Sequence, residues 1–213
     1  MPPVYARIER NRQPLLVRYR LAKKERHPAL FEGCVTNMDK AEAVMNDKEV
    51  WHRHLGSYGI CHSEGKLLVI RKRGGPYTRR YDLPGGSLEP LQSLQQTVER
   101  EFIEESGIRI NIKRCLGTRD YVVAWRRENF DHTHCHHIAI LYEALYADGD
   151  VANSPNIDDS DGAEWIDMDK LQLEDASPLV RDAVHWIRTG HLPVEAARFD
   201  DWKFGGTSAC RRH

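Results

Sequence analysis

The sequence lacks the features that would place a chain in a membrane or in an oxidising compartment. Its five cysteines are scattered and form no Cys-x-x-Cys pair, which predicts free thiols. No apolar run approaches the length that crosses a bilayer. Residues 1–20 are punctuated by arginines and prolines, unlike a secretory signal. We therefore expect a cytoplasmic protein with no membrane contact.

The chain also lacks an excess of charge of either sign. Lysine and arginine number 31 and aspartate and glutamate number 32, so the formal net charge is -1. Without a global basic field, a long nucleic acid is not expected as a partner, and any phosphate recognition must be local. The length of 213 residues suits one well-buried core with appendages.

The distribution of apolar residues predicts three parts. A core domain is expected over residues 52–190, after an N-terminal extension over 1–51 and before a C-terminal tail over 191–213. Within the extension, Leu15–Tyr19 has the pattern of a strand and Asp39–Lys48 that of a short helix. The extension would pack either on the core or at the interface of a homodimer.

Strand and helix signals are mixed within the core. A helix is predicted after Ser177 and Pro178, which suit an N-cap and a first helical position, and it should end at Gly190. Apolar or alternating runs predict strands at residues 67–70, 108–112, 121–125, 138–144 and around 164–165. Periodicity alone therefore gives a fold class of α/β or α+β.

The segment Leu83–Ile108 carries the strongest chemical signal. A Gly85-Gly86 turn precedes a helical pattern that places Glu101, Glu104 and Glu105 at i, i+3 and i+4 on one face. Such a face taken alone is usually a solvated surface. Carboxylates this close repel one another unless a cation neutralises them, and oxygen ligands beside a turn suit Mg²⁺ or Mn²⁺. The turn and the acids together favour a metal-phosphate site.

The spacing in this segment resembles the signature of the Nudix hydrolases. That signature is Gly, five residues, Glu, seven residues and then Arg-Glu-U-x-Glu-Glu-x-Gly-U, where U is a bulky aliphatic residue. The matching positions are Gly86, Arg100, Glu101, Phe102, Glu104, Glu105, Gly107 and Ile108, with an aromatic Phe102 at the first aliphatic position. The resemblance extends from Leu67 to Arg188 and implies a mixed β-sheet sandwiched between helices.

The resemblance also implies a site and a reaction. Mg²⁺, with Mn²⁺ as a substitute, would be held by the Gly85 carbonyl, Glu101, Glu104 and Glu105, while Arg100 would orient Glu101. The implied activity is hydrolysis by water of a phosphoanhydride bond in a nucleoside diphosphate linked to another moiety, so the partner is a small nucleotide-type molecule. One alternative is a non-catalytic module of the same fold that binds a nucleotide or an ADP-ribose-like ligand. Isomerase chemistry on an isoprenoid diphosphate is a third reading.

One position departs from the signature. Gln92 stands where the family has its first Glu, which by resemblance serves mainly as a partner for the motif arginine, here Arg100. An amide offers Arg100 only a neutral hydrogen bond. We expect the change to loosen the junction between helix and loop more than to abolish metal binding. It is also the only direct support for the binding-module alternative.

Cationic and aromatic residues upstream of the motif are candidates for substrate contact. A strand over 67–73 places Arg71 and Arg73 on one face and Lys72 on the other. Arginine suits bidentate contact with phosphate, so Arg71 and Arg73 are predicted substrate contacts. The segment 74–80 is predicted as an exposed loop, in which Tyr77 would stack on a base or pack the loop.

Two acids outside the motif are candidates for an additional ligand or a general base. Asp159 lies in an acidic loop before the last predicted strand, and similar loops in the family often supply such a group; Glu143, on a predicted strand, is its rival. His132, His134 and His136 would share one face of a strand. Without a second cluster, the pattern favours partly exposed histidines over a zinc site.

Overall fold

The computed structural model describes residues 49–126, 131–155 and 160–203. These residues belong to the second of two compact units of the chain, 47–213. The predicted strand Leu15–Tyr19 and helix Asp39–Lys48 lie outside the described residues, as does Asp159.

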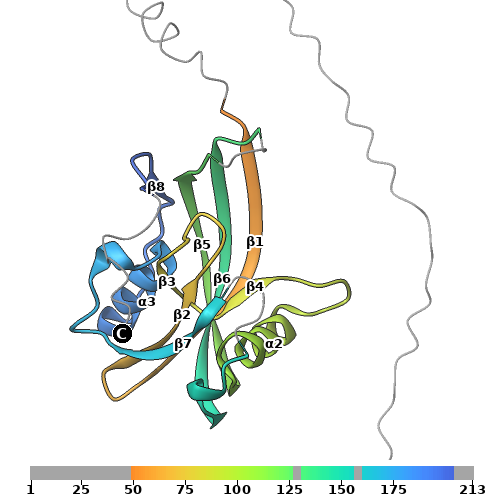
Figure 1. Cartoon of the computed structure of the whole chain (residues 1–213), viewed down its shortest axis with the longest axis vertical. Helices are drawn as coiled ribbons and strands as arrows, with labels where there is room; N and C mark the ends of the chain where they lie inside the picture. The colour runs from red at the N-terminus through yellow and green to blue at the C-terminus, as the bar shows by residue number, and fades with distance from the viewer. Residues whose placement is uncertain (1–48, 127–130, 156–159, 204–213) are drawn as a thin grey trace, which may run out of the picture. The chain divides into compact units, whose positions relative to one another are not determined.

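The described residues form a mixed sheet (Figure 1). Its strands are β1 (Trp51–Ser63), β2 (Lys66–Lys72), β3 (Tyr81–Asp82), β4 (Gly85–Ser87), β5 (Ile108–Ala124), β6 (His134–Gly149), β7 (Ser160–Asp167) and β8 (Ala197–Phe199). The order is β3-β2-β1-β6-β5-β8, with β4 pairing with β1 and β7 with β2 off this path. Because β1 runs parallel to β6 and antiparallel to β4, both kinds of pairing meet on one strand.

Two helices lie on opposite sides of the sheet (Figure 1). Helix α2 (Leu94–Ser106) and helix α3 (Pro178–Thr189) each bury an apolar face in a core of their own. Successive side chains of a strand point to opposite faces, so Ile60 of β1 packs in the α3 core and Cys61 in the α2 core. Short 3₁₀ turns cover Val151–Asn153 and Leu173–Asp175. The prediction of a mixed sheet sandwiched between helices is confirmed.

Helix α3 begins and ends where the sequence predicts. The Ser177 hydroxyl accepts a hydrogen bond from the Val180 N–H at 3.2 Å, and Pro178 occupies the first turn. Gly190 ends the helix in the left-handed conformation, with a φ of 79°. Both signals are local in sequence, which is why they are predictable.

Strand β5 is longer than periodicity predicts. It joins the predicted strands 108–112 and 121–125, and its register against β6 shifts between Ile112 and Arg114 and again between Cys115 and Gly117. Such bulges interrupt the alternation of apolar and polar residues, so one strand has the pattern of two. Strand β8 lies in the segment expected as a tail and pairs parallel with β5.

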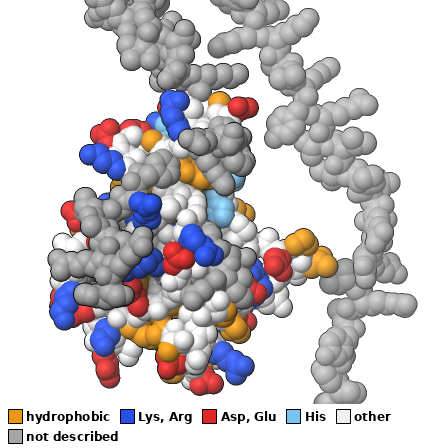
Figure 2. All heavy atoms as spheres, in the orientation of Figure 1, with side chains coloured by type: hydrophobic (Ala, Val, Ile, Leu, Met, Phe, Trp, Pro, Cys, Tyr) orange, Lys and Arg blue, Asp and Glu red, His pale blue; other side chains and the backbone are white. Residues whose placement is uncertain are grey.

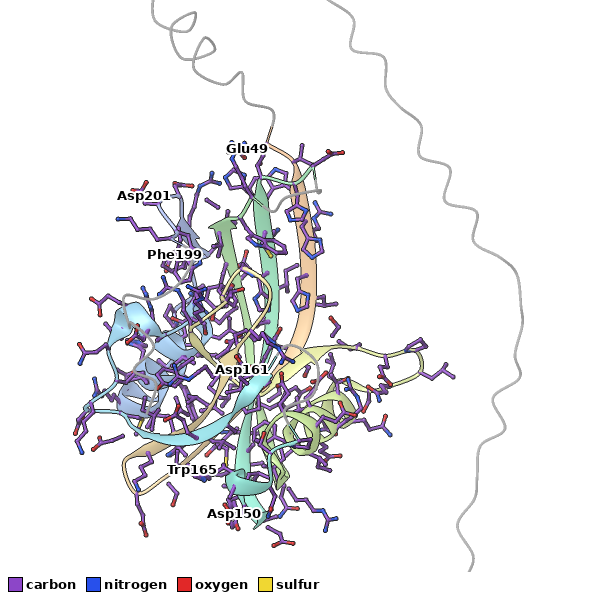
Figure 3. The ribbon with its side chains drawn as sticks, in the orientation of Figure 1. Glu49, Asp150, Asp161, Trp165, Phe199 and Asp201 are labelled. Carbon is purple, nitrogen blue, oxygen red and sulfur yellow. The ribbon has the colours of Figure 1, made fainter. Side chains whose placement is uncertain are left out.

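Charged side chains are spread over the surface of the described residues. Glu49 and Phe199 lie near one end of the sheet and Asp150 near the other (Figure 3). On the face drawn in Figure 2, Lys and Arg side chains are interspersed with Asp and Glu, in keeping with the net charge of -1. No helix in the described part of the chain is long and apolar enough to cross a membrane.

Candidate active site

The position of helix α2 is set by its caps and by close packing on β1. Ser93 and Gln96 form a capping box, in which each side chain accepts a hydrogen bond from the other's backbone N–H, at 3.2 and 2.9 Å. Gly59 of β1 lies so near Phe102 that a Cβ on Gly59 would fall 2.4 Å from its ring. With the apolar face held there, the acidic face of the helix meets the turn at 85–86.

The turn at 85–86 approaches its neighbours at distances that only glycine permits. Gly85 has a φ of +144°, and a Cβ there would lie 2.4 Å from the Ser57 carbonyl oxygen. A Cβ on Gly86 would lie 2.7 Å from Oε1 of Glu101. The absence of side chains therefore brings the backbone of β4 directly against a carboxylate.

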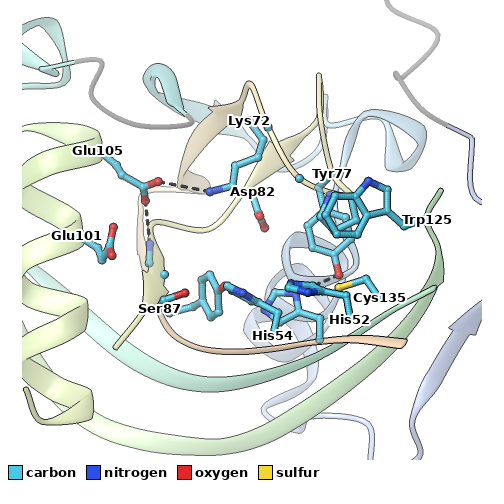
Figure 4. A pocket seen from close by; sticks show the side chains of 17 residues that line it. His52, His54, Lys72, Tyr77, Asp82, Ser87, Glu101, Glu105, Trp125 and Cys135 are labelled. Atoms are coloured by element: carbon cyan, nitrogen blue, oxygen red, sulfur yellow. Dashed lines mark hydrogen bonds and ion pairs between the residues drawn. The ribbon is translucent and has the colours of Figure 1, made fainter. Parts of the chain in front are cut away.

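Glu105 is the most buried of the three predicted glutamates, with 3% of its surface exposed. Its Oε2 accepts a hydrogen bond from the Gly85 N–H at 2.9 Å, and its Oε1 lies 3.6 Å from Nζ of Lys72. Dashed lines mark both contacts in Figure 4. A buried carboxylate needs such partners, and Lys72 supplies the positive charge.

Arg100 holds the other two acids of the helix. Its Nη2 donates to Glu101 Oε1 at 2.8 Å, and its Nη1 donates to Glu104 Oε2 at 2.5 Å. Burial raises the pKa of Glu101, and the Arg100 guanidinium only partly opposes that rise. Arg100 thus contacts the acid that it was predicted to orient, and Glu104 as well.

Gln92 contacts Arg100 through a neutral hydrogen bond, in which Arg100 Nε donates to Gln92 Oε1 at 3.3 Å. The amide nitrogen of Gln92 donates to Glu89 at 3.2 Å, and Glu89 Oε1 lies 4.0 Å from Arg100 Nε. The loop therefore brings a carboxylate near Arg100 from outside the motif. Motif spacing alone did not reveal this acid.

These acids border a pocket of about 340 Å³ whose two ends differ in chemistry. Figure 4 shows Glu101 and Glu105 on one side and His52, Trp125 and Cys135 on the other. The carboxylate end consists of Gly85, Gly86, Ser87, Glu101 and Glu105. The imidazole end consists of His52, Tyr77, Trp125, Cys135 and His137. Lys72 and Asp82 lie between the two ends in the view of Figure 4.

The imidazole end lies on the face of β6 opposite to His134 and His136. His132, His134 and His136 do not line the pocket, whereas Cys135 and His137, on the other face of the strand, do. Burial raises the pKa of the Cys135 thiol to about 12, so it remains protonated and is not an activated nucleophile. The alternation of the strand was predictable, but not which face would be buried.

The segment 74–80 is not an exposed loop, and that prediction is wrong. Tyr77 is 2% exposed and stacks on His137 with ring centroids 5.6 Å apart. Trp202 holds the segment in place, because its Nε1 donates to the Pro76 carbonyl at 2.8 Å and the Arg80 guanidinium lies 4.2 Å from its ring centroid. The covering residue comes from far along the chain, where no local pattern reveals it.

The two arginines predicted to contact substrate pair with acids of β7. Arg71 Nη2 lies 3.0 Å from Glu164 Oε1, and Arg73 Nη1 lies 3.4 Å from Asp161, which is labelled near the centre of Figure 3. Neither arginine lines the pocket, whereas Lys72 between them does. Their contact with substrate remains a prediction, and Lys72 is a cation that the prediction overlooked.

Of the two acids outside the motif, Glu143 does not line the pocket and Asp159 lies outside the described residues. Glu143 accepts hydrogen bonds from Lys113 at 2.8 Å and Arg114 at 2.7 Å. Burial alone would raise the pKa of Glu143, but these two cations outweigh it and lower the pKa. Asp82, which the sequence analysis missed, is buried and does line the pocket.

The carboxylate end offers donors for a hard metal ion. Within residues 49–126, 131–155 and 160–203, no group of three or more His, Cys, Asp or Glu side chains converges closely enough to hold an ion. Glu101, Glu105 and the 85–86 backbone nevertheless face the same end of the pocket. Oxygen donors of this kind fit Mg²⁺ or Mn²⁺. The cations Lys72 and Arg100 now supply the charge compensation that such an ion would add.

Comparisons with known proteins agree with this fold. An ADP-ribose pyrophosphatase of Methanocaldococcus jannaschii is 26% identical over 130 residues, 60% of this chain and 71% of that protein. A NUDIX hydrolase structure from Nitrosomonas europaea superposes with a TM-score of 0.52 at 18% identity, covering 66% of this chain and 92% of that one. A MutT NUDIX hydrolase from Burkholderia pseudomallei gives 0.50 at 21%, covering 63% and 97%. A family model described as NUDIX domain matches residues 50–187, more than half of the sequence, and the chain therefore belongs to that family.

Proposed function

We propose that the protein is a Nudix-type pyrophosphohydrolase that cleaves a phosphoanhydride bond in a nucleoside diphosphate linked to another moiety, with water as the nucleophile. The observation that carries the proposal is the carboxylate end of the pocket, where Glu101 and Glu105 stand beside glycine backbone and near Lys72. Acids that bind a divalent ion, next to a cation that binds phosphate, suit a polyanionic substrate.

The resident ion in this proposal is Mg²⁺, with Mn²⁺ as a substitute. Glu101, Glu105 and the Gly85 carbonyl would hold it. Glu104 is the fourth predicted ligand, and in the structure it accepts a hydrogen bond from Arg100. When bound, the ion would offset the negative charge that develops as the phosphoanhydride bond breaks.

The chain's own residues account for binding and proton transfer. Lys72 would pair with a phosphate oxygen, and Arg100 keeps Glu101 oriented. Glu101 stands at the carboxylate end of the pocket and is one proposed acceptor of the proton from the attacking water. Asp159 remains the second proposed base.

The setting of the enzyme belongs to the same proposal. The described cysteines Cys61, Cys115 and Cys135 are free thiols, which supports a reducing, cytoplasmic location. A small nucleotide-type substrate is the proposed partner. The role of residues 1–51, on the core or in a homodimer, remains a prediction.

The test is hydrolysis of a panel of nucleoside diphosphate derivatives with Mg²⁺, with Mn²⁺ and with EDTA. Glu105→Gln should lower turnover by about 100-fold or more, while its amide oxygen still accepts the Gly85 N–H and preserves the fold. Glu99→Gln, on the exposed face of the same helix, is the matched control and should leave turnover unchanged.

The same panel separates hydrolase from binding module. Tight binding without turnover of any compound would contradict the hydrolase and make Gln92 the mark of a ligand sensor. Thermal unfolding of each variant shows whether a lost activity is a lost fold.

A further inference from the structure

His137 lines the pocket, and its two ring nitrogens differ in their contacts with the described residues. The residue is 2% exposed, and its Nδ1 lies 3.1 Å from the Tyr77 hydroxyl. Its Nε2 is buried and has no hydrogen-bond partner within the described part of the chain. A buried polar atom left unpaired costs free energy that a bound group would recover. A buried nitrogen without a partner, on a residue that lines a pocket, therefore points to a ligand.

Tyr77 determines which nitrogen of His137 carries the proton. Burial raises the pKa of Tyr77 well above its ordinary value and lowers that of His137 well below its own, so phenol and imidazole are both neutral. The His137 Nδ1 is the acceptor that the described residues offer to the Tyr77 O–H. A neutral imidazole that accepts at Nδ1 carries its hydrogen on Nε2. His137 therefore presents an N–H donor.

Aromatic rings surround this donor, and Lys72 in the same pocket contributes a positive charge. Trp125 and His52 meet edge to face with centroids 5.7 Å apart, and the His54 ring lies 4.8 Å from that of His137. The five residues of the imidazole end include no carboxylate, lysine or arginine. Aromatic walls with one directed donor suit a planar ring that carries acceptors on its edge.

We propose that the imidazole end holds the heteroaromatic base of the substrate, with Trp125 and His52 against the ring and the His137 Nε2–H donating to a ring nitrogen or carbonyl oxygen. The proposal rests on the proposed function, because the diphosphate then occupies the carboxylate end beside Lys72. Nucleobases have a π face and edge acceptors, whereas a sugar joined through the diphosphate has no π face. The base thus sets the orientation of the substrate in the pocket.

The first test uses the unaltered full-length protein and matched ligands. With Mg²⁺, kcat/KM is measured for ADP-ribose and UDP-glucose and for 5-phosphoribosyl diphosphate, which carries a diphosphate and a ribose but no base. Without metal, calorimetry compares AMP with ribose 5-phosphate. Each base-bearing ligand should be favoured by about tenfold or more. Equal values for the two classes in both assays would overturn the assignment.

Variants then show which residues recognise the base. Trp125→Leu should lower the preference for base-bearing ligands by about 10-fold or more, and His137→Leu by about 5- to 10-fold. His137→Gln, which keeps an N–H donor, should retain part of that preference. His136→Gln is the control, because His136 Nε2 lies 3.2 Å from Asp120 and outside the pocket.

The outcomes separate this inference from the proposed function. In one outcome no compound of the panel is hydrolysed, AMP still binds more tightly than ribose 5-phosphate, and Trp125→Leu weakens AMP binding. That outcome would contradict the hydrolase and support the base site. Hydrolysis with a preference that none of the variants changes would keep the hydrolase and remove the base site. If His137→Leu fails to fold, two other measurements test the base site. They are the ligand preference of Tyr77→Phe, which no longer fixes the His137 tautomer, and that of the unaltered protein.

Discussion

The two ends of the pocket are assembled in different ways. The carboxylate end comes from one continuous segment, the turn at 85–87 and helix α2, so its acids are brought together by a single helical repeat. The imidazole end comes from β1, β6 and the residue after β5, which meet through sheet pairing, and from the segment 74–80, which packs on them through Tyr77. A site whose residues are close in the sequence can be predicted from their spacing, whereas a site whose residues meet across a sheet cannot.

The cation between the two ends offers the sharpest test of this contrast. Lys72→Met removes the positive charge that faces Glu105 and the proposed phosphate site, so KM should rise by about 10- to 100-fold. Arg71→Met removes a partly exposed ion pair with Glu164 and should change KM by less than about fivefold. A larger effect at Arg71 would restore the expectation drawn from the sequence.

The imidazole end should also show itself in the pH dependence of stability. His137 has a depressed pKa because it is buried, and His54, Lys72 and His136 lower it further. Its contribution to stability is therefore complete above the unfolded-state pKa of about 6.5 and is lost as pH falls toward the folded value. Melting temperatures of the unaltered protein should decline between about pH 7.5 and pH 5 more steeply than those of His137→Gln. Identical slopes for the two proteins would show that His137 is not buried neutral.

The departure at Gln92 should have the smallest effect. Gln92→Glu strengthens the attraction to Arg100 but sets two carboxylates side by side, since Gln92 now donates to Glu89. The free energy of unfolding should change by less than about 0.5 kcal/mol, and should rise by about 0.5–1 kcal/mol only when Glu89→Gln is also present. Urea unfolding of the two single variants and the double variant measures this coupling. An equal gain in both backgrounds would mean that Glu89 does not compensate for Gln92.

The elements that the sequence predicts well are those with local signals. Helix α3 is bounded by Ser177 and Gly190, and both are residue types that favour the cap positions they occupy. Strand β5 is less predictable because its bulges depend on the partner strand β6. The segment 74–80 is missed altogether, because the residue that covers it, Trp202, lies more than a hundred positions away.

The sequence by itself determined the family, the helix that carries Glu101, Glu104 and Glu105, and the glycine turn beside it. Each of these depends on spacings within a single helix or turn, where backbone geometry dictates which side chains are neighbours. Only the tertiary structure decided that Lys72 rather than Arg71 or Arg73 lines the pocket, and that His137 is buried there with a ring nitrogen that no described residue pairs. Strand alternation divides residues into two faces, but which face is enclosed depends on the segments that pack against it.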